Sequence, residues 1–167
     1  MERTIPLTRG MVAIVDEENY KILSAYKWHA HKGSKTFYAR TNIPSQKTNG
    51  RRYVQVFMHT MLLKTPKGYE PDHKNGNGLD NRIKNLRTCT KNENLCNRSG
   101  SKKGTSVYKG VYWSNKDNRF RSQITKAGIR ISLGAYVNET EAALAYNIAA
   151  KKYHGEFARV NFVPKMG

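Results

Sequence analysis

The sequence predicts an α+β chain with three parts: a small antiparallel sheet, a central strand–turn–strand–helix unit, and a three-stranded antiparallel sheet packed on one helix. Short runs of alternating apolar residues in the first and last thirds predict strands. A capping motif near residue 90 and an alanine-rich stretch after residue 138 predict helices. The expected boundaries are 1–58, 59–98 and 106–163, with a linker at 99–105.

Strand-like runs in the first part are MVAIVD (11–16), the stretch around TFYAR (36–40) and RRYVQVFM (51–58). The segment PSQKTNG (44–50) is typical of a turn or loop. Leu23, Tyr26 and Trp28 follow three consecutive acidic residues, which predicts a short helix leading into a strand. A small antiparallel sheet is the expected result.

The central part begins with HTMLLK, which predicts a short helix that TPKG then ends. The stretch YEPDHKNGNGLDNRIKNLR follows, and its two Asn-Gly dipeptides predict a tight hairpin turn, because both central residues of such a turn take positive φ. Thr90 and Glu93 fit a capping box. A helix is therefore expected from about Lys91, with Asn94 in its first turns.

The last part follows SGSKKGT, which has the small, polar composition of a linker. The expected strands are YKGVYW (108–113), RFRSQIT (119–125) and IRISLGAY (129–136). A helix should start at Asn138, with Thr140 contributing to its cap, and end at Gly155. The alanines that give it a narrow apolar face, suited to close packing on the sheet, are Ala142, Ala143, Ala145 and Ala149.

The charge of the chain points to a polyanionic partner. There are 30 Lys and Arg against 12 Asp and Glu, a formal net charge of +18. An anionic membrane is the alternative to nucleic acid, but the basic residues are spread along the chain and no apolar run approaches the ~20 residues of a membrane span. The N-terminus lacks the apolar core of a signal peptide. Cys89 and Cys96 are too few for a disulfide framework, which favours a reducing, intracellular setting.

Asp72 and His73 beside the predicted turn are either incidental surface residues or a pair presented for chemistry. Phosphodiester hydrolysis needs a proton acceptor, which His73 can provide, and charge neutralisation, which a divalent cation provides. Asp72 is a hard carboxylate suited to Mg²⁺, and Asn94 can add an amide oxygen if its helix folds back across the hairpin. Adjacent strand residues point to opposite faces, so both can serve one site only if the strand is distorted or the phosphate straddles its end.

Other histidines carry weaker signals. His59 begins an apolar helix and is either a phosphate contact or a structural residue. His29, His31 and His154 show no partner pattern and are expected to be structural. Both cysteines are expected to be ordinary thiols.

DHKNGNGLDNRIKNLR followed by KNENLCN resembles the HNH endonuclease signature, in its phage and intron-encoded homing form. The resemblance implies a ββα-metal core with one divalent ion, Mg²⁺ or Mn²⁺. It places the metal-binding aspartate at Asp72, the general base at His73 and the last motif position at Asn94. It also implies that Asn85 orients His73 or braces the loop, and that Arg82 of the DNR segment can meet a phosphate.

The last three strands have one polar and one apolar face. On 119–125 the polar side carries Arg119, Arg121, Gln123 and Thr125, and the next strand adds Arg130. Segment 102–130 has eight basic residues against one acidic, too biased for an ordinary solvated face. Such a face can lie in a DNA major groove.

YKGVYW, RFRSQI, ISLGAY and TEAALAYNIAAKKYHGEFARVNF resemble the plant APETALA2/ethylene-response-factor DNA-binding domain over about 107–163. The resemblance implies DNA binding through the sheet, with Lys109 and Arg130 at positions where the family uses contacting arginines. Other contact positions differ, so the plant target sequence does not transfer; they are Tyr112, Ser114, Thr125 and Ser132. Phage and bacterial chains commonly combine this domain with an HNH core.

We therefore expect a metal-dependent, site-recognising DNA endonuclease of homing type that nicks or cuts double-stranded DNA. The N-terminal sheet and the C-terminal domain would grip the duplex while the central unit cuts. We expect a monomer without a required protein partner or membrane contact, in the cytoplasm of a bacterial or phage-infected cell. The alternatives are a non-catalytic sequence-specific DNA-binding regulator that keeps the fold, and an RNA-binding protein of ribosomal type.

Overall fold

A computed structural model describes residues 1–45, 52–97 and 104–164. The chain divides into two compact units, Met1–Lys91 and Asn92–Gly167, and each is described by itself. The turn predicted at 44–50 and the linker predicted at 99–105 lie mostly outside the described residues. Whether 1–58 and 59–98 act as separate functional parts stays a prediction.

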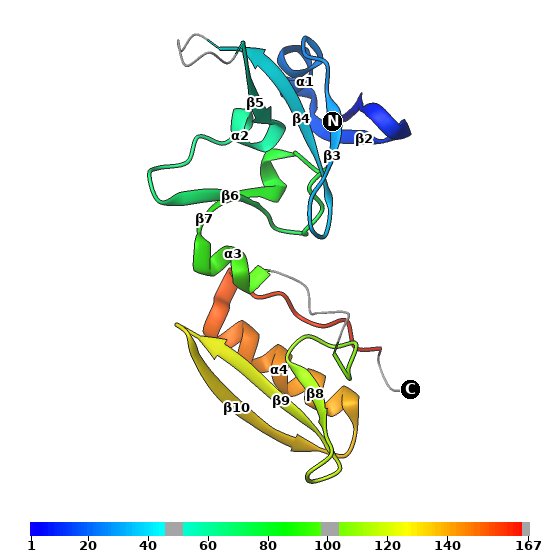
Figure 1. Cartoon of the computed structure of the whole chain (residues 1–167), viewed down its shortest axis with the longest axis vertical. Coiled ribbons are helices and arrows are strands. Elements are labelled where there is room, and N and C mark those ends of the chain that lie inside the picture. Colours follow the sequence, from blue (N-terminus) through cyan, green and yellow to red (C-terminus); the bar gives the residue numbers. More distant parts are fainter. Residues whose placement is uncertain (46–51, 98–103, 165–167) are drawn as a thin grey trace. The chain divides into compact units, whose positions relative to one another are not determined.

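The first unit opens with a two-stranded antiparallel sheet (Figure 1). Its strands are β1 (Glu2–Pro6) and β2 (Val12–Asp16), and α1 (Glu17–Ser24) follows directly. Two glutamates in the first turn of α1 favour a helix start there, because acidic groups stabilise the N-terminal end of the helix dipole. The sequence predicts β2 and the helix, but β1 was not predicted.

A three-stranded sheet completes the N-terminal part, in the order β3-β4-β5. Its strands are β3 (His29–Lys32), β4 (Phe37–Pro44) and β5 (Tyr53–Phe57), and the short helix α2 (Met58–Leu62) follows. The core of this unit is apolar and draws on both sheets and both helices. Its buried members are Ile5, Leu7, Ala13, Val15, Leu23, Trp28, Ala30, Ala39 and Met58.

The central hairpin pairs β6 (Tyr69–His73) antiparallel with β7 (Leu86–Thr90), and α3 (Lys91–Asn97) follows. The strand order and the start of α3 are those expected from the sequence. The connection is not the tight turn that the Asn-Gly dipeptides predicted: it spans residues 74–85 and ends in the 3-10 turn Ile83–Asn85.

The two Asn-Gly dipeptides in this connection have different roles. Gly76 has φ +74° and donates its N–H to the His73 carbonyl at 2.8 Å, which closes a turn. At position 78 a glycine is needed because no side chain fits, since a Cβ there would lie 2.5 Å from the Phe37 carbonyl oxygen. The second dipeptide also lies in a turn, since Asp80 donates its N–H to the Asn77 carbonyl at 3.1 Å, but neither turn alone joins the two strands.

The connection is fixed onto the N-terminal sheets. Ile14 of β2 donates its N–H to the Leu79 carbonyl at 2.8 Å and accepts the Asn81 N–H at 2.7 Å. Gly78 donates its N–H to the Thr36 hydroxyl at 3.1 Å. Segments far apart in sequence thus hold the end of the hairpin in place.

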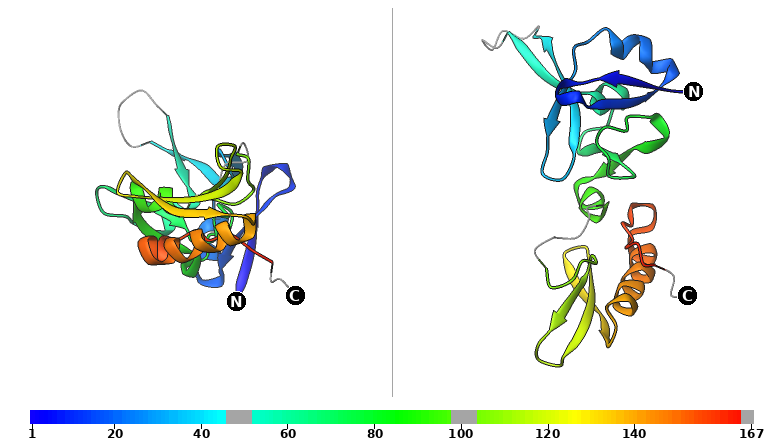
Figure 2. Two further views of the ribbon diagram at one scale, coloured as in Figure 1. Left: turned by 90° about the horizontal axis from the view of Figure 1, so that it is seen from below. Right: turned by 90° about the vertical axis from the view of Figure 1, so that its right-hand side faces the viewer.

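The second unit contains a three-stranded antiparallel sheet with one long helix along it, as the right-hand view of Figure 2 shows. The sheet order is β10-β9-β8, from β8 (Val111–Ser114), β9 (Arg119–Lys126) and β10 (Ile129–Tyr136). The helix α4 (Glu139–His154) ends at Gly155, which has φ +53°. Its buried residues are Ala142, Ala143, Tyr146, Ala149 and Ala150.

Three details of this unit differ from the expectations. The residue before α4 is Asn138, so Thr140 lies within the helix rather than at its cap. Ala145 is only half-buried, because the buried stripe runs through Tyr146. Alternation with Arg130 predicts Ile129 on the apolar side of the sheet, but Ile129 is 70% exposed. Among the residues that the structure describes, no helix has the length and apolarity needed to cross a membrane.

Candidate active site

Asp72 and His73 are the last two residues of β6, and both are buried, with 8% and 5% of their surfaces exposed. The register with β7 continues without a shift to the His73–Leu86 pair. The strand is therefore regular, and the two side chains point to opposite faces. Of the two arrangements that would let both serve one phosphate, the one in which the phosphate straddles the strand end agrees with this geometry.

Asp72 lies directly opposite Arg87 in the β6–β7 ladder. The guanidinium donates from Nε at 3.0 Å and from Nη2 at 2.8 Å to the same carboxylate oxygen, Oδ2. Both side chains are less than a tenth exposed. The ion pair satisfies two buried charges that would each be costly alone.

His73 has Asn81 as its hydrogen-bond partner in the connection, with 3.3 Å between Nε2 and Oδ1. In this assigned amide orientation the oxygen can only accept, so Nε2 carries the hydrogen and Nδ1 has the lone pair. Burial lowers the pKa of His73 and outweighs the hydrogen bond to Asn81 and the charges of Asp72 and Asp80, which raise it. The ring is consequently neutral at pH 7 and able to accept a proton.

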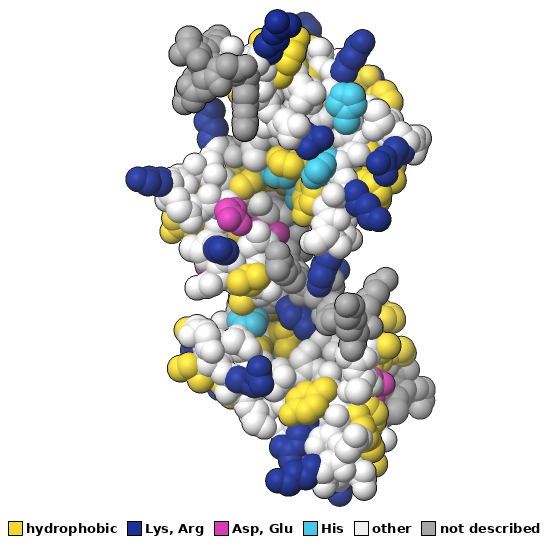
Figure 3. Space-filling view, in the orientation of Figure 1, with side chains coloured by type: hydrophobic (Ala, Val, Ile, Leu, Met, Phe, Trp, Pro, Cys, Tyr) yellow, Lys and Arg dark blue, Asp and Glu magenta, His cyan; other side chains and the backbone are white. Residues whose placement is uncertain are grey.

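His59 of α2 packs edge-on against His73, with ring centroids 5.0 Å apart and an interplanar angle of 86°. Its other side stacks on Phe57 at 5.4 Å, and Tyr38 contacts both histidines. Burial, and secondly the charge of His73, lower the pKa of His59 to about 3. His59 is therefore uncharged at neutral pH, and any contact with phosphate would be through a neutral ring. Figure 3 shows histidine and hydrophobic side chains together on this face of the first unit.

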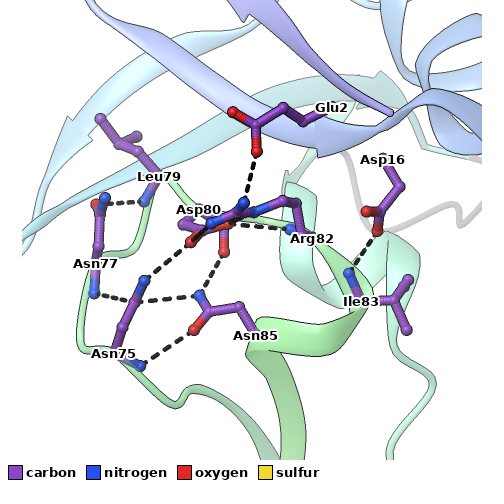
Figure 4. A network of polar contacts seen from close by, with 9 residues as sticks. All are labelled: Glu2, Asp16, Asn75, Asn77, Leu79, Asp80, Arg82, Ile83 and Asn85. Atoms are coloured by element: carbon purple, nitrogen blue, oxygen red, sulfur yellow. Dashed lines mark hydrogen bonds and ion pairs between the residues drawn. The ribbon is translucent and has the colours of Figure 1, made fainter.

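A polar network centred on Asp80 gives the connection its shape (Figure 4). Asp80 accepts hydrogen bonds from Arg82 Nη2 at 2.6 Å and from Asn75 Nδ2 at 2.9 Å. Asn85 Nδ2 donates to the Asp80 carbonyl at 2.7 Å and to Asn75 Oδ1 at 3.1 Å, while its own oxygen accepts the Asn75 N–H. The resemblance implies that Asn85 either orients His73 or braces the loop, and these hydrogen bonds agree with the second role.

Arg82 joins this network to β1. Its Nη1 donates to Glu2 Oε2 at 2.6 Å, while Nε and Nη2 bind Asp80. The bond to Asp80 raises the pKa of the guanidinium. A phosphate contact by Arg82 stays a prediction, and in this structure its donors are directed to two carboxylates instead. Close by, the Ile83 N–H donates to Asp16 Oδ2 at 2.7 Å.

The metal ligands expected from the sequence belong to different units: Asp72 to the first, and Asn94, on α3, to the second. The oxygens of a carboxylate and an amide fit a hard divalent cation, with water and phosphate completing the coordination. Within the described ranges, no group of three or more His, Cys, Asp or Glu side chains could hold a metal. A site of one Asp and one Asn is not a group of that kind. Cys89 and Cys96 are free thiols.

The outer face of the C-terminal sheet has two kinds of basic residue. Arg119 and Arg130 are exposed. Arg121 is ion-paired with Asp117 of the β8–β9 turn. Gln123 lies beside Ser132 of β10 in the pairing register.

Lys109 does not lie on this sheet, because it precedes β8. Its ammonium donates to the Cys96 carbonyl in the last turn of α3 and lies 5.9 Å from the centroid of the Tyr146 ring. The role carried over for Lys109 from the plant domain stays a prediction, and the geometry here is that of a helix C-terminal cap.

Sequence reasoning missed three residues around the hairpin: Tyr38, Asn81 and Arg87. Arg87 could have been found by pairing the predicted strands, since a basic residue opposite a buried aspartate is expected in a stable ladder. Asn81 depends on the path of the connection, and Tyr38 depends on the packing of β4 beside the two histidines; neither of these long-range arrangements has a local signal in the sequence.

The residues of this site lie in a part of the chain that is similar to known proteins. Residues 64–96 match the family model described as HNH endonuclease. An uncharacterized HNH endonuclease of Acanthamoeba polyphaga mimivirus is 29% identical over 155 residues, which cover 92% of this chain and 76% of that protein. Protein 3.8 of Escherichia phage T7 is 33% identical over 109 residues, covering 65% of this chain and 88% of that protein.

The central part of the chain is thus an HNH endonuclease domain. The chain therefore carries an HNH endonuclease domain and is similar to viral proteins, one of which is described as an HNH endonuclease. A further similarity is to the AP2-like ethylene-responsive transcription factor AIL7 of Arabidopsis thaliana, 41% identical over 66 residues. These cover 38% of this chain but only 13% of the plant protein.

Proposed function

We propose that the chain is a metal-dependent DNA endonuclease of the homing type, with His73 as general base. The observation that carries this proposal is the buried, neutral His73 next to Asp72 at the end of a strand, within the segment that matches the HNH model. A general base must be unprotonated at the working pH, and the burial of His73 achieves this.

In the proposed mechanism, His73 accepts the proton of the attacking water at the nitrogen that Asn81 leaves unprotonated. Asn81 holds the ring in that tautomer, and the Asp80 network holds Asn81 near the end of the strand. Asp72 and Asn94 would hold a divalent ion, Mg²⁺ or Mn²⁺. Such an ion neutralises the charge of the scissile phosphate and stabilises the leaving oxygen.

Double-stranded DNA is the proposed substrate, bound in part by the outer face of β8–β10. A net charge of +18, the exposed arginines of this sheet and the similarity to a plant AP2-like factor support this assignment. Loose recognition of a long site by separate binding and cutting parts suits a homing enzyme. A monomer with one active site would nick one strand most simply.

A second candidate is a DNA-binding regulator that keeps the HNH fold without activity. The ion pair between Asp72 and Arg87 favours it, because a carboxylate held by a guanidinium already has a structural role. The presence of the full set Asp72, His73, Asn85 and Asn94 favours the enzyme.

Plasmid relaxation separates the two candidates. Supercoiled DNA is incubated with the wild type, with His73→Ala and with His29→Ala, each with Mg²⁺, Mn²⁺ or EDTA. His29 is the matched control because it is an exposed histidine of the same unit. The endonuclease predicts metal-dependent nicking by the wild type and His29→Ala, and none by His73→Ala. DNA binding without nicking under any metal would establish the regulator, and preference for structured RNA over duplex DNA would exclude both.

A further inference from the structure

Arg121 lies on β9, the central strand of the C-terminal sheet, opposite Tyr112 of β8 and Ala135 of β10. Its guanidinium is held by Asp117 from the turn between β8 and β9. Nε donates to Asp117 Oδ2 at 2.9 Å, and Nη2 donates to the same oxygen. The hydrogen bonds from Arg121 lower the pKa of Asp117, so this carboxylate stays charged at neutral pH.

The other two arginines of this face are not ion-paired to a described carboxylate. The side chains of Arg119 and Arg130 are exposed, and neither forms a hydrogen bond or an ion pair with another described residue. Their long side chains keep their rotamer freedom until they bind. An arginine of this kind is suited to contact a phosphate, which accepts hydrogen bonds from many directions.

Asp117 uses only some of the N–H donors of the Arg121 guanidinium. Asp117 uses the side edge of the guanidinium, formed by Nε and one hydrogen of Nη2. The end edge, formed by Nη1 and the second hydrogen of Nη2, is left with two parallel donors. The Arg121 side chain is 40% exposed, so solvent reaches this face of the sheet. Two parallel N–H donors are what the O6 and N7 acceptors of guanine require in the major groove.

We propose that Asp117 is a positioning residue that aims Arg121 at base edges, so that Arg121 reads sequence while Arg119 and Arg130 contact phosphates. The proposal rests on DNA binding by this sheet, as proposed above. The simpler role for the pair is to stabilise the turn, because Asp117 lies in the turn and Arg121, four residues later, lies in β9. Only the positioning role predicts that removing the carboxylate lowers the preference of the chain for one duplex over another.

The test measures binding of the full-length chain in EDTA, where metal-dependent cleavage does not occur. A preferred duplex is first selected from a random pool with the wild type. Dissociation constants for that duplex and for a shuffled duplex of the same composition are then compared. Asp117→Ala removes a negative charge and by electrostatics alone would tighten binding to both. Positioning predicts instead that the preference for the selected duplex falls by about 5- to 100-fold, the usual range for one bidentate base contact.

Three further variants complete the test. In an Arg121→Ala background, Asp117→Ala is expected to leave the preference unchanged. Arg121→Lys keeps the charge but lacks the fork, so it should lose the preference while thermal unfolding shows the turn intact. Arg119→Ala should weaken binding to both duplexes equally and lower the salt slope by about one.

Tighter binding of Asp117→Ala to both duplexes by the same factor would overturn the proposal. So would a wild-type chain that selects no preferred duplex from the random pool. In either case metal-dependent nicking by the wild type can still occur, so failure of this inference is distinct from failure of the proposed endonuclease. Absence of DNA binding altogether would reject both.

Discussion

Arg87 donates two hydrogen bonds to a single oxygen of Asp72, directly across the β6–β7 ladder. The predicted metal-binding carboxylate is therefore already part of a buried ion pair in the folded protein. Its position is set by the pairing of two strands rather than by a ligand. Replacing this residue should consequently affect folding as well as cleavage.

Asp72→Ala is expected to lower the free energy of unfolding by roughly 3–5 kcal/mol, because it leaves the Arg87 guanidinium buried without its partner. Asp72→Asn keeps a hydrogen-bond acceptor and should cost less. Urea denaturation followed by circular dichroism measures both. The double variant Asp72→Leu, Arg87→Leu is the control and should recover most of the loss, since an apolar pair of similar size fits a buried site. If Asp72→Ala unfolded at the same urea concentration as the wild type, the ion pair would have no role in stability.

The pH dependence of cleavage should reflect His73. Its pKa is lowered by burial, so the neutral ring is populated further into the acid range than for a free histidine. The nicking rate at saturating metal is expected to rise with pH, with the midpoint of its acid limb below the usual 6.5 of a histidine. Single-turnover rates between pH 5 and 8 provide the measurement, with DNA binding in EDTA at each pH as the control. An acid limb centred at pH 7 or above would show that His73 is not the group titrating.

His59 should make the fold sensitive to acid. Its pKa is about 3 in the folded protein against a usual 6.5, so between these values the unfolded chain binds more protons. The free energy of unfolding should therefore fall as the pH falls from 6.5 towards 3, by at most about 1.4 kcal/mol per pH unit from this group.

His59→Phe should make that slope shallower, because the ring keeps its size and no longer titrates. His29→Phe, at an exposed site, is the matched control and should leave the slope as in the wild type. Denaturant midpoints at pH 4, 5, 6 and 7 decide the outcome. Equal slopes for His59→Phe and the wild type would reject this account.

Lys109 provides a test of the plant resemblance. Its ammonium caps α3 through the Cys96 carbonyl, so Lys109→Met should lower the melting temperature and leave the salt dependence of DNA binding unchanged. Arg130→Met, on the sheet itself, should reduce the slope of log K against log salt by about one. The DNA affinities of the two variants are compared between about 50 and 300 mM salt, a range in which counterion release changes the affinity measurably. A slope reduced equally by both variants would establish Lys109 as a phosphate contact.

Much of the fold follows from the sequence, because local patterns decide it. The strands β2, β4, β5, β9 and β10 and the helices α1, α2, α3 and α4 lie where alternation, acidic N-terminal turns or capping residues predict them. The first strand, β1, was missed because its burial pattern has a single buried residue, Ile5. Its pairing with β2 is what makes it a strand.

The candidate site was predictable in its residue types but not in its contacts. Asp72 and His73 follow from the motif, whereas Asn81 reaches His73 only because residues 74–85 fold as a braced loop. The expectation of a tight turn failed because the local Asn-Gly signal is overruled by contacts with Ile14 and Phe37, both far away in sequence. Long-range pairings of this kind have no local pattern.

The docking of residues 74–85 on β2 sets the smallest piece of this protein that can be moved into another chain. Ile14, Asp16 and Glu2 each bond to that connection. A graft limited to residues 59–98 would lack those partners and leave the end of β6 without their support. A graft that keeps the shape of this connection should therefore carry β1 and β2 together with the hairpin.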